Sequence, residues 1–228
     1  MGKLILHGMK LSPCVRSTFA VASEIGIEME YKIVDLIKGE NFNPEFMEIN
    51  PVHAVPVLED DGKYIIDGHA ILSYLVDKYA KDDSLYPKDP FQRAMVDQRL
   101  HFDSGILYMR LRNLSMRVYT EDHPKFPQKD IDALYQSYDY VEKFLSKQPF
   151  LAGDKMTIAD LCCVCTITSG ALFAPISEER YPKLSDWIKR LSDLPYYEET
   201  NAKDNAEYLE FLKGILTQKN GNANIEVY

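Results

Sequence analysis

The stretch KLILHGMKLSPCVRSTFAVASEI, residues 3–25, decides the start of the fold. Its apolar run at positions 4–6 is typical of a short buried strand. Pro13 is favoured in the first turn of a helix and Gly26 stands where helices commonly end, so we expect a helix over 13–25. Ser12 then lies directly before a helix, with the thiol of Cys14 inside the first turn.

The next fifty residues continue this alternation of strands and helices. We expect a strand at 28–36, a short helix at 43–50, strands at 55–60 and 64–67, and a helix at 69–80. Asp61-Gly62, between the two adjacent strands, is a dipeptide favoured in tight hairpin turns. The order βαβαββα predicts a small mixed sheet covered by helices, the thioredoxin-like arrangement.

The second half of the chain has helical patterning throughout. Charged residues and two prolines in KDDSLYPKDP, residues 81–90, indicate a linker. After it we expect helices at 91–119, 128–147, from 157 onward, at 182–194 and at 202–219. Thr157 and Asp160 have the spacing of a capping box at the start of the third helix. The sequence thus predicts an α/β domain (1–82), a linker (83–90), an all-α domain (91–219) and a loose tail (220–228).

Composition excludes several classes of partner. The chain has 46% hydrophobic residues, which is enough for well-packed cores, and a net charge of −9. This negative charge argues against nucleic acid or an anionic membrane surface as the main partner. No apolar run approaches the roughly 20 residues of a membrane helix. We expect a cytoplasmic protein.

The cysteines and histidines give no metal prediction. Cys14 stands alone, and the other three lie in the apolar run LCCVCTITSGALF, residues 161–173, where free thiols behave as small core residues. A soft-metal cluster in this run is the weaker alternative. No two of the five histidines have metal-ligand spacing along one helix. We therefore expect no metal site and no bound cofactor.

Three segments could together hold a small thiol peptide. A serine before a helix is most often an N-cap, but a hydroxyl at a helix N-terminus can also donate to a thiolate. A cis bond between Val55 and Pro56 would expose the backbone of Val55 to a peptide-like ligand. At Asp67-Gly68 a helix N-terminus can hold a carboxylate while the aspartate takes an ammonium group.

The chain resembles the cytosolic glutathione transferases, and most closely the insect epsilon class, with the delta class next. The resemblance covers about residues 3–200 and is carried, in order, by SPCVRS, NPVHAVPVLEDDG, DGHAILSYLVDKY, SLYPKDP, RLHFDSG, LAGDKMTIADL and LPYYEE. It implies an enzyme in which glutathione, as co-substrate, binds the thioredoxin-like domain. A small hydrophobic electrophile would bind against the helical domain, and the chain would form a homodimer.

The resemblance also implies roles for individual residues. Ser12 matches the serine that stabilises the thiolate. The predicted glutathione contacts are Asn41, His53 (glycyl end), Ala54, Val55 and Pro56 (cysteinyl part), Asp67 and Gly68 (glutamyl end), His69 and Arg112. The predicted electrophile pocket comprises Tyr108, Leu111, Ser115, Met116, Tyr119 and Leu209. This sequence departs from the family at Gly68, where serine is usual, and at Asn41, where histidine is frequent.

Two other functions compete with transferase activity. A carrier of hydrophobic ligands would keep the fold without catalysis, and the departures at Gly68 and Asn41 leave room for it. A thioltransferase would use Cys14, but in cysteine-using relatives the reactive thiol stands directly before the proline, where this chain has Ser12. The physiological reaction stays open among detoxification, dehydrochlorination of insecticides and processing of hormone precursors.

Overall fold

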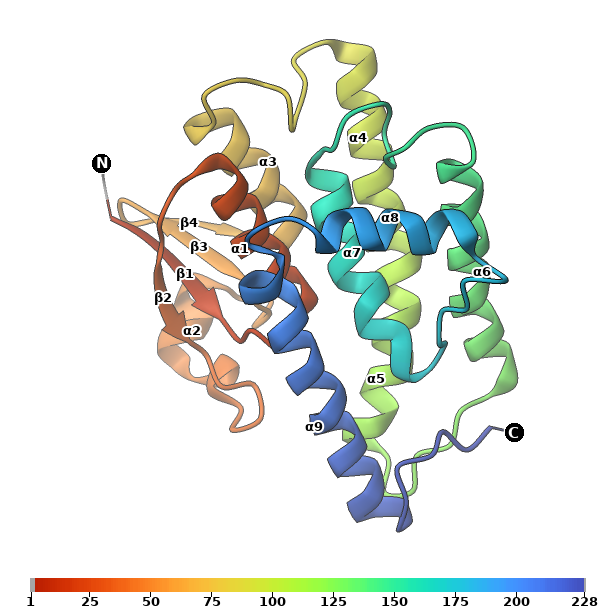
Figure 1. The fold of residues 1–228 in the computed structure, drawn as a ribbon. Coiled ribbons are helices and arrows are strands. Elements are labelled where there is room, and N and C mark those ends of the chain that lie inside the picture. Colours follow the sequence, from red (N-terminus) through yellow and green to blue (C-terminus); the bar gives the residue numbers. More distant parts are fainter. Residues whose placement is uncertain (1–2, 228) are drawn as a thin grey trace.

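A four-stranded mixed sheet forms the first half of the chain (Figure 1), in a computed structural model that describes residues 3–227. The strands are β1 (Leu4–Gly8), β2 (Glu30–Ile33), β3 (Val57–Asp60) and β4 (Lys63–Ile66). Their order is β2-β1-β3-β4, with β1 parallel to β2 and antiparallel to β3. The tight turn at Asp61 and Gly62, both with positive φ, joins β3 to β4 as predicted.

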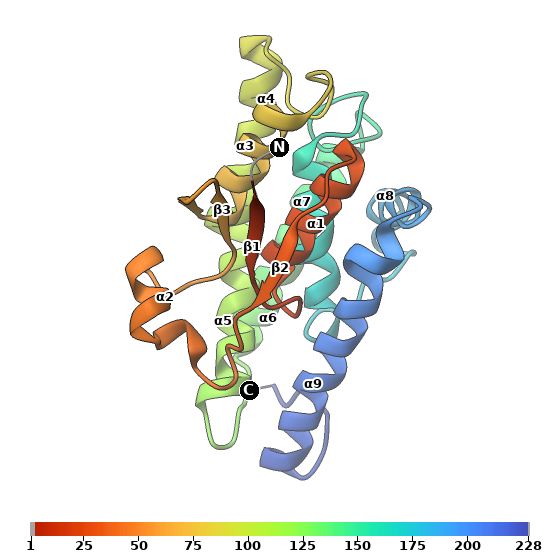
Figure 2. The same ribbon diagram turned by 90° about the vertical axis from the view of Figure 1, so that its left-hand side faces the viewer.

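Helices cover both faces of this sheet (Figure 2). The helices α1 (Pro13–Ile25) and α3 (Gly68–Tyr79) lie on the face toward the second domain, and α2 (Pro44–Ile49) lies on the other. Alternate strand residues divide between the two faces, because successive side chains of a strand point in opposite directions. Leu6 and Leu58 pack in the core beneath α1 and α3, and Val57 packs with Phe46 of α2. The predicted βαβαββα order is confirmed, and a short 3₁₀ turn, η1 (Glu40–Phe42), adds to it.

The second half is helical, as predicted. Its helices are α4 (Pro90–Phe102), α5 (Tyr108–Thr120), α6 (Gln128–Leu145), α7 (Ile158–Ser169), α8 (Pro182–Ser192) and α9 (Lys203–Asn220), with short turns η3 (Gly170–Leu172) and η4 (Glu198–Ala202). The expected helix over 91–119 is interrupted by a π-helical turn, η2 (Asp103–Leu107), between α4 and α5. Apolar spacing does not register the extra residue of such a turn, which often marks a functional site.

Helix α7 runs through the centre of the helical domain and is buried along its length. Its start carries the predicted capping box of Thr157 and Asp160. The fully buried Asp160 carboxylate also accepts hydrogen bonds from Leu151 N–H (2.8 Å) and Trp187 Nε1–H (2.9 Å). The cysteines of α7 are free and buried, as expected of core residues.

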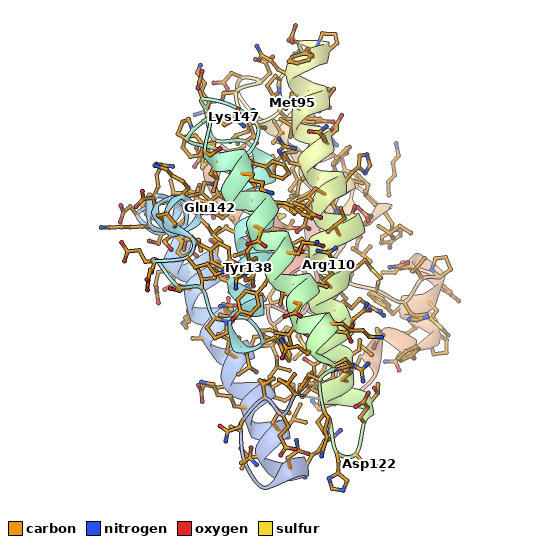
Figure 3. All side chains as sticks on the ribbon, turned by 90° about the vertical axis from the view of Figure 1, so that its right-hand side faces the viewer. Met95, Arg110, Asp122, Tyr138, Glu142 and Lys147 are labelled. Carbon is orange, nitrogen blue, oxygen red and sulfur yellow. The ribbon has the colours of Figure 1, made fainter. Side chains whose placement is uncertain are left out.

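The neighbouring helices pack by specific polar contacts as well as apolar ones. In Figure 3, Arg110 extends from α5 toward α6, the helix that carries Tyr138. Its guanidinium donates to the carbonyl of Ala133 (2.6 Å) and to Ser137 Oγ (3.0 Å). These bonds hold α5 against α6. They therefore also set the position of α5 relative to the first domain.

The two domains share a core and a buried arginine. Ile158 and Leu161 of α7 pack in the same cluster as the inner face of the sheet. Arg16 of α1 is fully buried, and its guanidinium donates to Asn201 Oδ1 and Asn205 Oδ1, both at 2.9 Å. The same group donates to Ser169 Oγ and to the carbonyls of Lys10, Leu11 and Cys165. Helix α1 is therefore fixed to the helical domain.

The tail differs from the loose segment expected at 220–228. Phe126 N–H donates to the carbonyl of Glu226 (2.8 Å), and Phe126 bridges Val227 in parallel. The tail thus returns to the loop before α6. Residues 1–2 and 228 lie outside the described residues. Between residues 3 and 227, none of the helices combines the length and apolar character that crossing a bilayer requires.

Candidate active site

Ser12 lies at the N-terminus of α1, and its hydroxyl does not cap the helix. Its carbonyl accepts from Val15 N–H and Arg16 N–H, and its φ and ψ of −77° and 126° are those of an N-cap residue. Its side chain nevertheless makes no capping hydrogen bond, and it is partly exposed. The common role of a serine at this position is therefore not fulfilled. The hydroxyl can donate to a ligand placed at the positive end of the helix dipole.

The segment before β3 presents free backbone groups. The bond between Val55 and Pro56 is cis, as predicted. Within the described part of the chain, the Val55 N–H and carbonyl have no hydrogen-bond partner. His53 and Ala54 are exposed, and His53 has a positive φ of 47°. These residues form an accessible edge suited to pairing with an extended peptide.

Asn41 supports the backbone of this edge from the protein interior. It is buried, and its Nδ2 donates to the carbonyl of His53 at 2.9 Å. The ring of Phe42 lies 4.7 Å from that of His53. The direct glutathione contact expected for Asn41 is therefore at odds with its burial. Its amide instead holds His53 in its left-handed conformation.

Asp67 and Gly68 stand at the start of α3. Asp67 has a φ of 80°, and one of its oxygens accepts from His69 N–H (2.9 Å) and Ala70 N–H (3.1 Å). Hydrogen bonding to His69 and these backbone donors lowers the pKa of Asp67 to about 2, despite partial burial. Two donors of the helix terminus are thus taken by Asp67 itself. In the region from residue 3 to 227, the Gly68 N–H has no acceptor, so it is the one that remains for a ligand.

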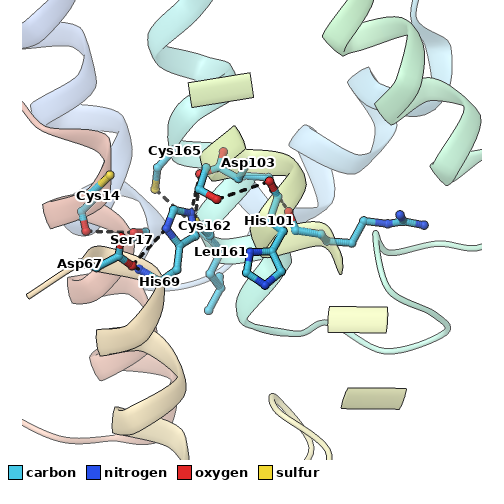
Figure 4. Close-up of polar contacts among 12 residues, drawn as sticks. Cys14, Ser17, Asp67, His69, His101, Asp103, Leu161, Cys162 and Cys165 are labelled. Atoms are coloured by element: carbon cyan, nitrogen blue, oxygen red, sulfur yellow. Dashed lines mark hydrogen bonds and ion pairs between the residues drawn. The ribbon is translucent and has the colours of Figure 1, made fainter. Parts of the chain in front are cut away.

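A buried polar cluster lies directly behind Asp67 (Figure 4). His69 Nε2–H donates to Asp103 Oδ2 (2.9 Å), and its Nδ1 lies 3.5 Å from Asp67 Oδ1. Burial opposes the charged imidazole, but the two carboxylates outweigh it and raise the pKa of His69 to about 9. The thiol of Cys162 donates to the same oxygen of Asp103 at 3.5 Å. His69 is thereby fixed in orientation beside the start of α3.

The residues expected in the electrophile pocket differ in burial along α5. Leu111 and Ser115 are buried in the helical core, where Ser115 Oγ bonds Tyr208 O–H at 2.8 Å. Tyr108 and Tyr119 lie on the same helical stripe as these two residues, at spacings of three, four and seven, but they remain accessible. The accessible members of the predicted pocket are Tyr108, Met116 and Tyr119, with Leu209 of α9 partly buried, and Arg112, predicted as a glutathione contact, is exposed nearby on α5. The predicted pocket therefore loses Leu111 and Ser115 to the core.

The accessible face of α5 lies near the start of α1. The neighbouring Cys14 and burial together raise the pKa of Tyr108, while Arg112 opposes this effect. Cys14 itself is a poor thiolate, because burial and the nearby carboxylates of Asp103 and Asp67 raise its pKa. A nucleophilic role for Cys14 is disfavoured on this ground.

Comparison with known proteins identifies the family. Models of the N-terminal and C-terminal domains of glutathione S-transferase match residues 6–83 and 108–195. Glutathione S-transferase 1 of Manduca sexta is 43% identical over 204 residues, covering 89% of this chain and 94% of the relative. The chain belongs to the glutathione S-transferase family.

Solved structures place this glutathione S-transferase near the epsilon class. Glutathione transferase E6 of Drosophila melanogaster has a TM-score of 0.93 and 41% identity, with 99% of this chain and 100% of that chain covered. An epsilon-class enzyme of the housefly, Musca domestica, has a TM-score of 0.92 and 42% identity, with 93% and 98% covered. A delta-class enzyme of Nilaparvata lugens has a lower TM-score of 0.87 and 32% identity, with 93% of this chain and 99% of that chain covered.

A homologue from Drosophila mojavensis was solved with bound glutathione. It has a TM-score of 0.92 and 40% identity, and both chains are fully covered. The predicted resemblance to the insect epsilon class, with delta next, is thereby confirmed.

Sequence reasoning missed several polar residues around the site of this transferase. Asp103 and Cys162 lie behind His69, and Arg16 holds the carbonyls that precede Ser12. The signal for Asp103 was its place in RLHFDSG, a motif used only for the resemblance. A carboxylate two residues before a glycine within a long helical pattern was itself a sign of a special turn.

Proposed function

We propose that this transferase binds glutathione along Ser12, the His53–Pro56 edge and Asp67-Gly68, and transfers its thiol to hydrophobic electrophiles. The observation that carries the proposal is the Ser12 hydroxyl, which stands at a helix N-terminus and makes no capping hydrogen bond among residues 3–227. The relative solved with bound glutathione supports the choice of co-substrate.

The proposed binding mode of glutathione follows from the backbone groups that Val55 and Gly68 leave available. The Val55 N–H and carbonyl pair with the cysteinyl part of the tripeptide, and His53 lies toward its glycyl end. The glutamyl carboxylate takes the Gly68 N–H, and the exposed Asp67 carboxylate binds the ammonium group. Arg112, exposed on α5, adds positive charge at the opposite wall.

Ser12 activates the nucleophile by stabilising its anion. Its O–H donates to the thiolate, a bond to a charged group worth roughly 1.5–3 kcal/mol. The helix terminus adds roughly 0.3–2 kcal/mol. At about 1.4 kcal/mol per pKa unit, the two lower the thiol pKa from ~8.5 by one to a few units. Proton loss to water then suffices, and the sulfur attacks the electrophilic carbon as the leaving group departs.

The electrophile occupies the accessible face of α5. Tyr108, Met116 and Tyr119 offer aromatic and thioether surface that suits small apolar compounds. The same thiolate can act as a base for dehydrochlorination or add reversibly for isomerisation. We propose further that the chain is a homodimer, with the small domain of one subunit against the helical domain of the other.

Replacing Ser12 by alanine tests the assignment. Ser12→Ala should lower turnover of glutathione and 1-chloro-2,4-dinitrobenzene by roughly 10–100-fold near pH 6.5, since a bond of ~1.5–3 kcal/mol is lost. The pKa of bound glutathione should rise with little change in its KM. Cys14→Ala is the matched control and should stay active.

Two outcomes would reverse the assignment. An active Ser12→Ala with an inactive Cys14→Ala would make the thiol the working group. A wild-type chain that binds glutathione without turning over any electrophile would make the protein a carrier.

A further inference from the structure

His69, Asp103 and Cys162 bring three different metal-ligating groups together. They come from the start of α3, from the π-helical turn η2 and from α7, so no spacing along one helix reveals them. His69 Nε2, a carboxylate oxygen of Asp103 and Cys162 Sγ all lie within 4.8 Å of one another. We propose that these residues form a binding site for Zn²⁺ or a divalent cation with the same ligand preference.

The distances suit a tetrahedral ion. With Zn–N and Zn–O near 2.0–2.1 Å and Zn–S near 2.3 Å, tetrahedral donors stand about 3.3–3.6 Å apart. Here the nitrogen lies 2.9 Å and the sulfur 3.5 Å from Asp103 Oδ2. The first pair must open by a few tenths of an ångström, and the third pair, His69 Nε2 and Cys162 Sγ, lies within 4.8 Å and must stand near 3.6 Å around the ion.

The carboxylate of Asp103 supports the site independently. Asp103 is fully buried, and its Oδ1 has no hydrogen-bond partner among the described residues. An unpaired carboxylate oxygen in the interior is costly, because burial removes its water without replacement. A divalent cation bound by both oxygens of the Asp103 carboxylate supplies the missing partner.

The surroundings complete the requirements of a zinc site. A metal-bound imidazole normally has its second nitrogen held by a carboxylate, and Asp67 Oδ1 lies 3.5 Å from His69 Nδ1. His69 also lines a pocket of about 360 Å³ whose wall includes Asp67 and Asp97. The pocket gives an ion a route to His69, and its carboxylates attract cations. Binding displaces the imidazolium proton of His69 and the thiol proton of Cys162, so two protons leave as one ion enters.

Cobalt spectroscopy gives a direct test. Co²⁺ titrated into the purified full chain at pH 8 should bind at one ion per chain and produce the near-ultraviolet charge-transfer absorption of a cobalt thiolate. Cys162→Ala should lose this absorption. Cys163→Ala, which removes the adjacent buried thiol outside the cluster, should keep it.

Thermal unfolding gives a second readout that needs no activity. Zn²⁺ should raise the melting temperature of the wild type and of Cys163→Ala, but not that of Cys162→Ala or His69→Gln. His69→Gln stands at the partly exposed rim and keeps the test open should Cys162→Ala fail to fold. Absence of the absorption in the wild type, its persistence in Cys162→Ala, or an equal rise of the melting temperature with Zn²⁺ in wild type and His69→Gln would each overturn the proposal.

Discussion

The Cβ of Cys14 lies 3.1 Å from the position that a Cβ would take on Gly68. This contact is tighter than ordinary van der Waals packing, and Pro56 Cδ stands on another side at 3.8 Å. The φ of Gly68 is not positive, so sterics rather than backbone strain decide which side chain fits here. The packing of α1 against α3 therefore leaves little room for a side chain at position 68.

Variants with serine and alanine at position 68 distinguish the effect of a hydroxyl from the effect of the Cβ contact with Cys14. Both variants introduce the same Cβ, but only Gly68→Ser adds a donor for the proposed glutamyl carboxylate. We expect Gly68→Ser to bind glutathione about 10-fold or more tightly than Gly68→Ala, since a bond to a carboxylate is worth roughly 1.5–3 kcal/mol. Titration calorimetry on the three forms measures this ratio. Equal dissociation constants in the two variants would place the glutamyl end elsewhere.

Asp160 should be among the residues on which stability depends most. Asp160→Ala leaves buried N–H donors of Leu151, Thr157 and Trp187 without acceptors, each costing about 1–3 kcal/mol. We expect a loss of about 3–5 kcal/mol in the free energy of unfolding by urea. Asp160→Asn keeps one oxygen and should lose less. Alanine and asparagine variants of equal stability would refute this account.

Asp60 should make stability depend on pH in the acid range. Burial raises its pKa, but hydrogen bonds from Lys78, Tyr74 and Tyr79 outweigh this and lower it. The stabilisation is therefore complete above the unfolded pKa, near 3.8, and is lost as pH falls through the lower folded value.

A substitution at the neighbouring position provides the comparison. Asp60→Asn should be less stable than wild type at pH 7, and the difference should shrink at pH 3 and below. Asp61→Asn, at the exposed hairpin turn, should change little. An Asp60→Asn deficit that does not vary with pH would contradict the expectation.

The proposed homodimer predicts a definite mass. Sedimentation equilibrium at micromolar concentration should give about twice the chain mass of 26.2 kDa. Exposed apolar side chains such as Phe91 (75%) and Val52 (59%) provide surface for such an interface. A fully active monomer would rule this out.

Local sequence rules predicted the frame of the molecule well. The helix 13–25, the Asp61-Gly62 turn and the Thr157–Asp160 capping box each depend on residues a few positions apart. The interactions that form these elements lie within one segment, so apolar spacing and capping residues are enough to predict them. Ser12 and Val55 were found for the same reason, because each is marked by the proline that follows it.

The remaining parts of the site depend on contacts between distant segments. Asn41 is buried behind His53, and Cys14 meets Gly68, through packing that no local pattern records. Which side chains of α5 are buried could be assigned only once α9 was in place. Tyr208 of α9 covers Ser115 of α5 and forms a hydrogen bond with it. The π-helical turn at Asp103 shifts the helical phase by one residue, which periodicity alone does not detect.

Arg16 limits how far the sequences of the two domains can change independently of each other. Its buried guanidinium is shared among the loop before Ser12, helix α7, and Asn201 and Asn205 near α9. A chimera that joins this thioredoxin-like domain to the helical domain of a relative would need side-chain oxygens at both asparagine positions. The thioredoxin-like half therefore cannot be exchanged on its own, and we expect it to be retained together with the last helix.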